Sequence, residues 1–432
     1  MFFGALIASL AVVATGFSSK LDNLGIRGYV AAHVKMHDFS GAVMAVHQGR
    51  VAFAEAFGKA DVAANVANRT STRFLVGSIS KTFTAAAIEL LVKQGRIRYS
   101  DSLANYVPEY KQAKKITIRE LLEHSAGVPD YYGSSAFARD RRKDLSLAEL
   151  VRWLNAYPLD FIPGSENSYS NSGYSLLALV IERASGKPYA QYLRKNIFEP
   201  FGLQHTGDLA SGAPTGLAKG YDPAPAPAYL RPADAIAVGW LEGNGSIYST
   251  ADDLSRWLTV AQRGEDVNFK ALPYPFGWSL NRTSSHTLLE QDGRIPGYAA
   301  FISIDEQSRD KVIVLGNVQS AAVDVIAAQV RTAVAGRPLV AARERPSFAA
   351  SLGALKRFTG AYETGPVKLT VVLSGNVLFI VNQDGSRLPL DPISSGRFFF
   401  RPLFVYVGFK TNSHGSVTAM DWNNGQFTIP KR

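Results

Sequence analysis

The sequence predicts an α/β chain of the α+β type, in which an antiparallel sheet is assembled from both ends of a large domain around an inserted helical lobe. A small all-β barrel follows. Strand-like segments come first, helical periodicity fills the middle, and further strands with a closing helix end the large domain. From residue 350 onward, short alternating runs are separated by glycine and asparagine turns at about ten-residue spacing, which is typical of an antiparallel barrel or sandwich.

Composition narrows the class of protein. The 432 residues are 46% apolar, 11% aromatic and 19% charged, as in folded globular proteins. The net charge is +10, but the basic residues are scattered, so we expect a solvated basic surface and no nucleic-acid partner. The absence of cysteine excludes disulfides and cysteine–zinc sites. No P-loop or dinucleotide fingerprint occurs, and only His33 and His37 approach a metal-ligand spacing, so we expect no cofactor and no metal.

The first 19 residues are expected to be a signal peptide or an N-terminal anchor. Residues 1–17 form an uncharged apolar run that ends in small residues, and this length suits a signal-peptide core better than a membrane span. The run lacks a positively charged start, so membrane anchoring through a retained N-terminus is the alternative. In either case we expect an exported protein that is periplasmic, secreted or anchored in the cell envelope.

The large domain is predicted over residues 20–336. Its hairpin turn is expected at residues 48–50, and Gly186 is a good helix stop. Thr250 has the character of a helix N-cap. Helical patterns lie at 21–37, 101–108, 116–124, 146–154, 173–184, 189–198, 250–258 and 321–335, and strand patterns at 40–47, 51–57, 276–280, 298–304 and 311–315.

Two connecting segments interrupt these elements. Residues 223–227 alternate proline with alanine, so we expect a stiff, extended connector on the surface and outside the core. Residues 337–349 are predicted to be the linker to the barrel domain at 350–432. Strands of that domain are expected at 368–373, 377–381, 397–400, 405–409 and 416–422.

The first candidate for chemistry is the pair Ser78 and Lys81. A small-residue turn at Gly77 leads directly into an apolar helical segment, so Ser78 lies at a helix N-terminus and Lys81 follows one turn later on the same face. A lysine whose pKa is lowered by burial can take the proton of a serine nucleophile. Roughly one or two such pairs are expected by chance. A second copy, at residues 308–311, has the polar context of a hairpin turn.

A second cluster contains Tyr169 and Asn171, just before a predicted helix. In an extended loop, residues two apart point the same way, so both side chains can face one cleft. A phenol can shuttle a proton, and an amide can donate to a substrate carbonyl. The alternative is an ordinary polar loop that caps the helix.

Together these motifs resemble the serine β-lactamase and penicillin-binding-protein superfamily, in the branch with class C-like enzymes, D-amino-acid peptidases and related esterases. The resemblance covers roughly residues 20–335. It is carried by residues 74–91, 117–129, 169–171, 189–202, 245–254 and 296–298. It implies a β-lactamase/transpeptidase-like fold. It also implies that the barrel is similar to the lipocalin-like appendages of this superfamily, which can pack across subunits. A homo-oligomer held together through the barrel is therefore one expectation.

The resemblance also implies roles for particular residues. Ser78 is the acylated nucleophile, Lys81 and Tyr169 share the proton transfers, and Asn171 binds the substrate. The backbone N–H groups of Ser78 and Arg294 form the oxyanion hole. His124 belongs to a structural turn.

The third motif departs from the family. In place of Lys-[Ser/Thr]-Gly or His-x-Gly, this chain has Gln291, Asp292 and Gly293, and Gln291 cannot carry a charge. We expect Gln291 and Gly293 to contact substrate, and strand alternation to turn Asp292 and Arg294 away from the cleft. The loss of a cation argues against efficient hydrolysis of penicillins or cephalosporins. The nearby His286 is interpreted as a surface residue.

The leading hypothesis is an exported serine hydrolase that forms an acyl-enzyme on Ser78 and acts on a small ester, amide or peptide, as an esterase or a D-amino-acid peptidase or amidase. A β-lactamase or D-Ala-D-Ala carboxypeptidase is one alternative. A weakly active envelope protein that binds peptidoglycan is another, and it is not primarily an enzyme.

Overall fold

The structure is a computed structural model that describes residues 23–225, 228–264, 277–282, 286–342, 345, 348–365, 367–381, 387–423 and 425–432. The predicted signal peptide or anchor at 1–19 and the start of the predicted strand at residue 276 lie outside these residues. Among the helices of the described residues, none has the length and apolar character needed to cross a membrane.

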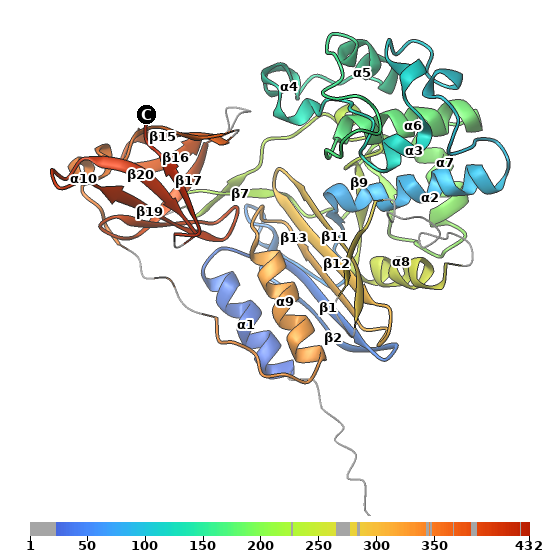
Figure 1. Cartoon of the computed structure of the whole chain (residues 1–432). Coiled ribbons are helices and arrows are strands. Elements are labelled where there is room, and N and C mark those ends of the chain that lie inside the picture. Colours follow the sequence, from blue (N-terminus) through green and yellow to red (C-terminus); the bar gives the residue numbers. More distant parts are fainter. Residues whose placement is uncertain are drawn as a thin grey trace, which may run out of the picture.

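One antiparallel sheet organises the large domain (Figure 1). Its six strands are ordered β10-β11-β12-β13-β1-β2, so β1, from the start of the chain, pairs with β13, from the end of the domain. The fold class predicted from the sequence is therefore confirmed. The strands are β1 (Gly41–His47), β2 (Arg50–Phe57), β10 (Ser279–Arg282), β11 (Thr287–Ile295), β12 (Tyr298–Asp305) and β13 (Lys311–Gly316).

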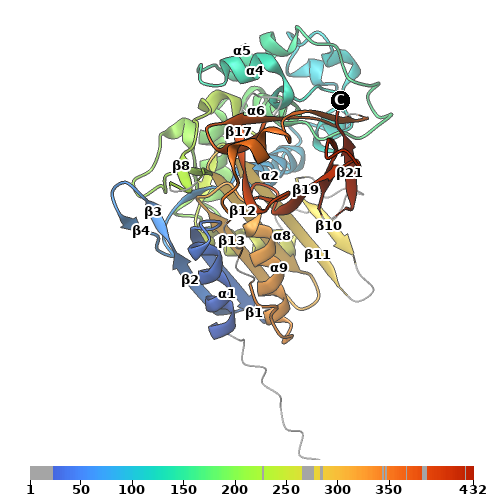
Figure 2. The same cartoon turned by 90° about the vertical axis from the view of Figure 1, so that its left-hand side faces the viewer.

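Helices cover both faces of this sheet. On one face, α1 (Asn23–Lys35) and α9 (Ala322–Val334) pack side by side and bury a core with Val43, Val312 and Val314 (Figure 2). On the other face lie α8 (Ala251–Arg263) and the helical lobe. The β-strands alternate their side chains between these two cores, which is why β1 and β13 are apolar apart from His47 and Lys311 at their ends.

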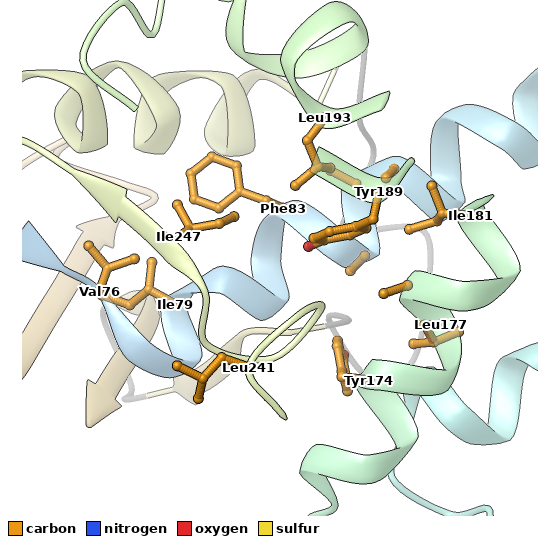
Figure 3. Packing of buried hydrophobic residues seen from close by; sticks show 14 of the residues in the cluster. Val76, Ile79, Phe83, Tyr174, Leu177, Ile181, Tyr189, Leu193, Leu241 and Ile247 are labelled. Atoms are coloured by element: carbon orange, nitrogen blue, oxygen red, sulfur yellow. The ribbon is translucent and has the colours of Figure 1, made fainter. Parts of the chain in front are cut away.

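The helical lobe packs around the helix that follows Ser78. Apolar side chains of α2 and α6 interlock with Leu241 and Ile247 from the later part of the chain (Figure 3). The ring of Phe83 stacks on Trp257 at 4.4 Å. The lobe helices are α2 (Ser80–Lys93), α3 (Ile118–Leu122), α4 (Ser135–Asp140), α5 (Leu147–Leu154), α6 (Asn171–Ser185) and α7 (Tyr189–Leu193), the last continued by a π-helical turn at Arg194–Phe198.

The helix predicted at residues 101–108 is wrong. Only a 3-10 turn at Leu103–Asn105 forms there, because Ser102 caps the Ala104 amide and the Leu103 amide donates to the Ile116 carbonyl. These local hydrogen bonds compete with a helix, and Pro108 lacks the amide needed to extend one.

The C-terminal part is an eight-stranded antiparallel barrel whose strands follow chain order. It is nearly closed, because β14 meets β21 at a bridge between Tyr362 and Lys431. The strands are β14 (Gly360–Thr364), β15 (Val367–Ser374), β16 (Val377–Val381), β17 (Arg387–Ser394), β18 (Arg397–Phe400), β19 (Val405–Thr411), β20 (Val417–Trp422) and β21 (Phe427–Pro430), preceded by α10 (Leu352–Lys356). The sequence pattern predicted five of these strands and missed β14, β17 and β21.

The prediction of a surface connector at residues 223–227 is wrong for residues 223 and 224, which are buried, whereas residue 225 is half-buried. β7 (Tyr221–Pro223) pairs with β8 (Leu230–Pro232), and Ala224 is buried. Residues 226 and 227 lie outside the described residues.

The barrel covers this connector. The guanidinium of Arg401 is 1% exposed and donates to the Ala224 carbonyl at 2.5 Å and to the Tyr229 carbonyl at 2.9 Å. Its Nε also lies 2.6 Å from the Asp391 carboxylate. The Tyr229 carbonyl also accepts from the Ala224 amide at 2.8 Å, so Arg401 and the hairpin backbone together satisfy the polar groups of the buried connector.

We expect Arg401→Ala to lower the free energy of unfolding by about 3 kcal/mol, because it leaves Asp391 and two carbonyls without their buried cation. The measurement is urea denaturation followed by circular dichroism. Lys410→Ala is the control, since Lys410 pairs with Asp421 at 3.4 Å on the barrel surface and should cost about 0–1 kcal/mol. Equal losses in the two variants would contradict the role of Arg401.

Candidate active site

The turn that carries Ser78 lies directly against strand β11. Gly77 has φ +53°, and a Cβ at this position would lie 2.6 Å from the Arg294 amide nitrogen. A Cβ at Gly293 would lie 1.9 Å from the Val76 carbonyl oxygen. Two glycines therefore permit a backbone approach that no other residue allows. It brings the backbone of Ser78 and that of Arg294 to one cavity.

Lys81 lies beneath this turn with its amine fully enclosed. The side chain is 1% exposed, and Nζ donates to Ser78 Oγ at 3.0 Å, to Asn171 Oδ1 at 2.8 Å and to the Asn244 carbonyl at 3.0 Å. The three partners match the three donors of an ammonium group. When the amine is neutral, its lone pair can accept the hydroxyl proton of Ser78.

Burial changes the proton affinity of this amine. It lowers the pKa of Lys81 to about 7, and the carboxylates of Asp130 and Asp292 oppose the shift only in part. A large share of the molecules therefore carry a neutral amine at neutral pH, next to the serine hydroxyl. A lysine in this state can act as a general base.

Tyr169 completes the group around Ser78. Its Oη lies 2.6 Å from Ser78 Oγ, and its ring centroid lies 4.7 Å from Lys81 Nζ. Tyr169 is 47% exposed, so the phenol connects the buried amine with solvent. The predicted pair Tyr169 and Asn171 does reach one cleft, although Asn171 is the first residue of α6 and not part of an extended loop.

His124 holds this tyrosine in place. Its ring packs on the Tyr169 ring at 4.6 Å, and its Nδ1 accepts a hydrogen bond from the Ser170 amide at 3.1 Å. Burial and the nearby Lys81 lower the pKa of His124 to about 3, so the imidazole is neutral. Sequence reasoning assigned His124 only to a turn, and its φ of 56° agrees with that. The contact with Tyr169 was missed.

Asp130 orients the amide of Asn171. Asn171 Nδ2 donates to the two carboxylate oxygens at 3.1 and 3.3 Å, which directs Oδ1 toward Lys81. Burial raises the pKa of Asp130, while Lys81 lowers it. Sequence reasoning missed Asp130 as well. The available signal was its place directly after residues 117–129, a segment that carries the family resemblance.

The third motif lies on β11, as expected. Gln291 is buried at the cavity and its Nε2 donates to the Asp292 carbonyl at 3.1 Å. The Arg294 guanidinium donates to the Ser320 carbonyl at 3.3 Å and pairs with Asp324, so it does not replace the missing cation. Strand alternation is confirmed, since Asp292 and Arg294 share a face and approach to 3.8 Å.

Asp292 and Arg294 are among the residues that line the cavity, but their side chains lie on the α9 face of the sheet, as alternation predicts. Asp292 is paired in register with Phe301 of the α1/α9 core, and Arg294 binds Asp324 of α9. This cavity has a volume of about 260 Å³. Its lining residues are Ser78, Tyr132, Tyr169, Asn171, Asn244, Gln291, Asp292, Arg294 and Ile295. His286 lies apart from the site and pairs with Asp305 at 2.5 Å. Across the described residues, no group of three or more His, Cys, Asp or Glu side chains could hold a metal ion.

Comparison with known proteins identifies the family. The family model described as Beta-lactamase matches residues 26–336. The chain belongs to the beta-lactamase family. This family and its penicillin-binding-protein relatives are serine hydrolases, and so is this protein. The superfamily suggested by the sequence motifs is therefore confirmed.

Relatives of this beta-lactamase-family protein match along most of its length. It is 27% identical over 425 residues to Penicillin-binding protein 4* of Bacillus subtilis (strain 168). The matched region covers 90% of this chain and 94% of the relative. The octameric penicillin-binding protein homologue from Pyrococcus abyssi shares its fold with a TM-score of 0.64 at 21% identity, over 95% of this chain and 100% of that one.

A D-amino acid amidase from Ochrobactrum anthropi SV3, solved with D-phenylalanine, also shares the fold. The TM-score is 0.65 at 23% identity, over 72% of this chain and 98% of that one.

We expect Gly293→Ala to displace β11 from the Ser78 turn, because the new Cβ overlaps the Val76 carbonyl oxygen. The variant should lose about 1–3 kcal/mol of stability. Labelling by a fluorophosphonate probe should slow at least tenfold. Both are measurable, by denaturation and by probe kinetics.

Gly408→Ala is the matched control for that prediction. Gly408 also lies in a strand, but its added Cβ would meet only Asp421 atoms at 3.6 and 4.0 Å. Probe labelling that is equally fast in Gly293→Ala and Gly408→Ala would show that the close approach of β11 is not needed.

Proposed function

We propose that this protein hydrolyses esters or amides through an acyl-enzyme on Ser78. The observation that carries the proposal is the Lys81 amine, 3.0 Å from Ser78 Oγ and with its pKa lowered to about 7. Tyr169, 2.6 Å from the same hydroxyl, supports the assignment. The three side chains supply a nucleophile, a base and a proton carrier in hydrogen-bond contact.

In the acylation step, the neutral Lys81 amine takes the proton of Ser78 while Oγ bonds to the substrate carbonyl carbon. The amides of Ser78 and Arg294 are proposed to stabilise the oxyanion that forms. Collapse of the intermediate breaks the bond to the leaving group, which receives the proton through Lys81 or Tyr169. Water then attacks the acyl-enzyme by the reverse proton path and releases Ser78.

Asn171, Gln291 and Gly293 are proposed to contact the substrate. Asn171 has its oxygen engaged by Lys81 and its nitrogen by Asp130, so it chiefly fixes the amine. Gln291 offers an uncharged amide at the cavity wall. Gly293 is not among the residues that line the cavity, and its proposed contribution is the close approach to the Ser78 turn that positions the Arg294 amide.

We propose that the preferred substrates are esters or D-amino-acid amides and peptides, in preference to β-lactams. The neutral Gln291 supports this choice, and so does the fold shared with a D-amino acid amidase. The name of the Bacillus subtilis relative favours the alternative of a β-lactamase or D-Ala-D-Ala carboxypeptidase. A weakly active peptidoglycan-binding envelope protein is the non-enzymatic alternative.

The first test is the pH dependence of acylation. The rate of fluorophosphonate labelling should rise as pH increases through about 7, because only the neutral Lys81 amine accepts the serine proton. Ser78→Ala should abolish labelling, and Lys81→Met should reduce it by at least about a hundredfold. A label that persists in Ser78→Ala refutes the nucleophile. A rate without a step near pH 7 refutes the base.

The second test compares substrates on the purified protein. We expect kcat/KM for a p-nitrophenyl ester or a D-amino-acid p-nitroanilide to exceed that for nitrocefin at least tenfold. Gln291→His should raise turnover of nitrocefin more than that of the ester, because it restores a group that can carry charge. Comparable rates on nitrocefin and the ester in the unchanged protein would favour the β-lactamase alternative.

We further propose that the protein is exported and that the barrel allows self-association. The apolar run at residues 1–17 supports export, and the octameric Pyrococcus abyssi homologue supports assembly. Fractionation of the source cells tests export. Light scattering of the purified chain tests assembly, and a monomer mass at working concentration would refute it.

A further inference from the structure

The end of strand β11 beside Ser78 has a strand neighbour on one side. β10 pairs with residues 287–290 of β11, whereas residues 291–295 pair with β12 alone in the described part of the sheet. The other edge of this stretch faces the Ser78 turn, because a Cβ at Gly77 would lie 2.6 Å from the Arg294 amide nitrogen. The proposed oxyanion amide therefore belongs to a stretch of strand that lacks one of its two backbone ladders.

The side chain of Arg294 ties this stretch to the loop before α9. Its guanidinium donates to the Ser320 carbonyl at 3.3 Å and pairs with Asp324 in the first turn of α9. The Arg294 side chain is 27% exposed, so this anchor is largely shielded from water. A displacement of Ser320 thus reaches the backbone of Arg294 through one side chain.

Ser320 is held in turn by the barrel. Its side chain is fully buried, and Oγ donates to the Arg401 carbonyl, between β18 and β19, at 3.3 Å. The same Oγ accepts from the Ala322 amide at 3.2 Å, so it joins the barrel backbone to the start of α9. Separation from Arg401 would leave a buried hydroxyl donor unsatisfied, which keeps the two segments together.

The guanidinium of Arg401 supports the same stretch by a second route. It donates to two carbonyls of the β7–β8 hairpin. The Tyr221 amide of β7 donates to the Gly297 carbonyl at 3.2 Å, and the Gly297 amide donates to the Asp222 carboxylate at 3.1 Å. Gly297 lies in the turn between β11 and β12, three residues after Arg294. One barrel residue therefore reaches both the Arg294 side chain and the turn that follows it.

We propose that the barrel positions the oxyanion hole, and that Ser320 and Arg401 are its positioning residues. They act on the Arg294 amide through the Arg294 side chain and the β11–β12 turn, and neither of them lines the cavity. The proposal rests on the proposed hydrolase function of Ser78. It gives the barrel a role in catalysis within one chain, separate from self-association.

The first test measures the preference for oxygen over sulfur in the reacting carbonyl. The substrates are p-nitrophenyl acetate and its thionoester, in which sulfur replaces the carbonyl oxygen. Sulfur is a weak hydrogen-bond acceptor, so a well-placed oxyanion hole favours the ester. Ser320→Ala and Arg294→Ala should each lower the ester-to-thionoester ratio of kcat/KM about tenfold, because the Arg294 amide leaves its position.

Two matched controls accompany these variants. Ser102 has the bonding pattern of Ser320, since its hydroxyl donates to a carbonyl at 3.1 Å and accepts from the amide two residues later at 3.3 Å. Arg331 joins α9 to β11 through Glu290, as Arg294 does closer to Ser78, but it does not line the cavity. Ser102→Ala and Arg331→Ala should keep the ratio of the unchanged protein. An equal fall in a control, or no fall in Ser320→Ala, overturns the proposal.

The double variant Ser320→Ala with Arg294→Ala tests the route. Because Ser320 is proposed to act through Arg294, the double variant should lose no more of the ratio than Arg294→Ala alone. Residues that act independently would multiply their effects, and that result would overturn the route.

Hydrogen exchange separates this proposal from the hydrolase function, because it needs no substrate. Arg401→Ala should speed exchange of the amides in residues 291–297 about tenfold and leave α6 unchanged, at a temperature at which circular dichroism shows the variant folded. Ser320→Ala provides the same readout if Arg401→Ala does not fold, and Lys410→Ala on the barrel surface is the control. Unchanged exchange at 291–297 overturns the proposal. Faster exchange without turnover of any substrate overturns the hydrolase function alone.

Discussion

The burial of one amine is the constraint on which the site depends. A charged ammonium is costly to enclose, so the protein either neutralises Lys81 or satisfies each of its protons. It does both, since the pKa falls to about 7 and three oxygens from separate segments surround Nζ. These segments are held by the packing of α2 against α6 and the later chain. The chemistry of Ser78 is thus a property of the core of the lobe.

The second half of the site comes from the sheet. β11 is fixed by pairing with β12, where Gly293 faces Ala300, and it meets the Ser78 turn through two glycines. The reacting groups therefore lie where the helical lobe meets the sheet, and one hydrophobic core joins the two. Charge follows the same division, because the amine belongs to the lobe and Asp292 to the sheet.

Much of the fold was predictable from local patterns, but its long-range contacts were not. Periodicity located β1, β2, α9 and the hairpin turn, where Gln48 and Gly49 both have positive φ. The i, i+3 spacing placed Lys81 beside Ser78. In contrast, His124 and Asp130 act through partners 46 and 41 residues away. The connector near Ala224 is buried by Arg401, 177 residues later, and no local pattern contains that partner.

The pairing of β1 with β13 has a consequence for folding during synthesis. Met44 lies opposite Ile313 in the centre of the sheet, so the first strand has no permanent neighbour on that side until nearly three quarters of the polypeptide has been made. Closing so long a loop is entropically costly, and it slows folding. The hairpin of β1 and β2 therefore leaves the ribosome long before its partner strand β13 has been synthesised. Its apolar side chains stay exposed during that time, and a chaperone can bind them.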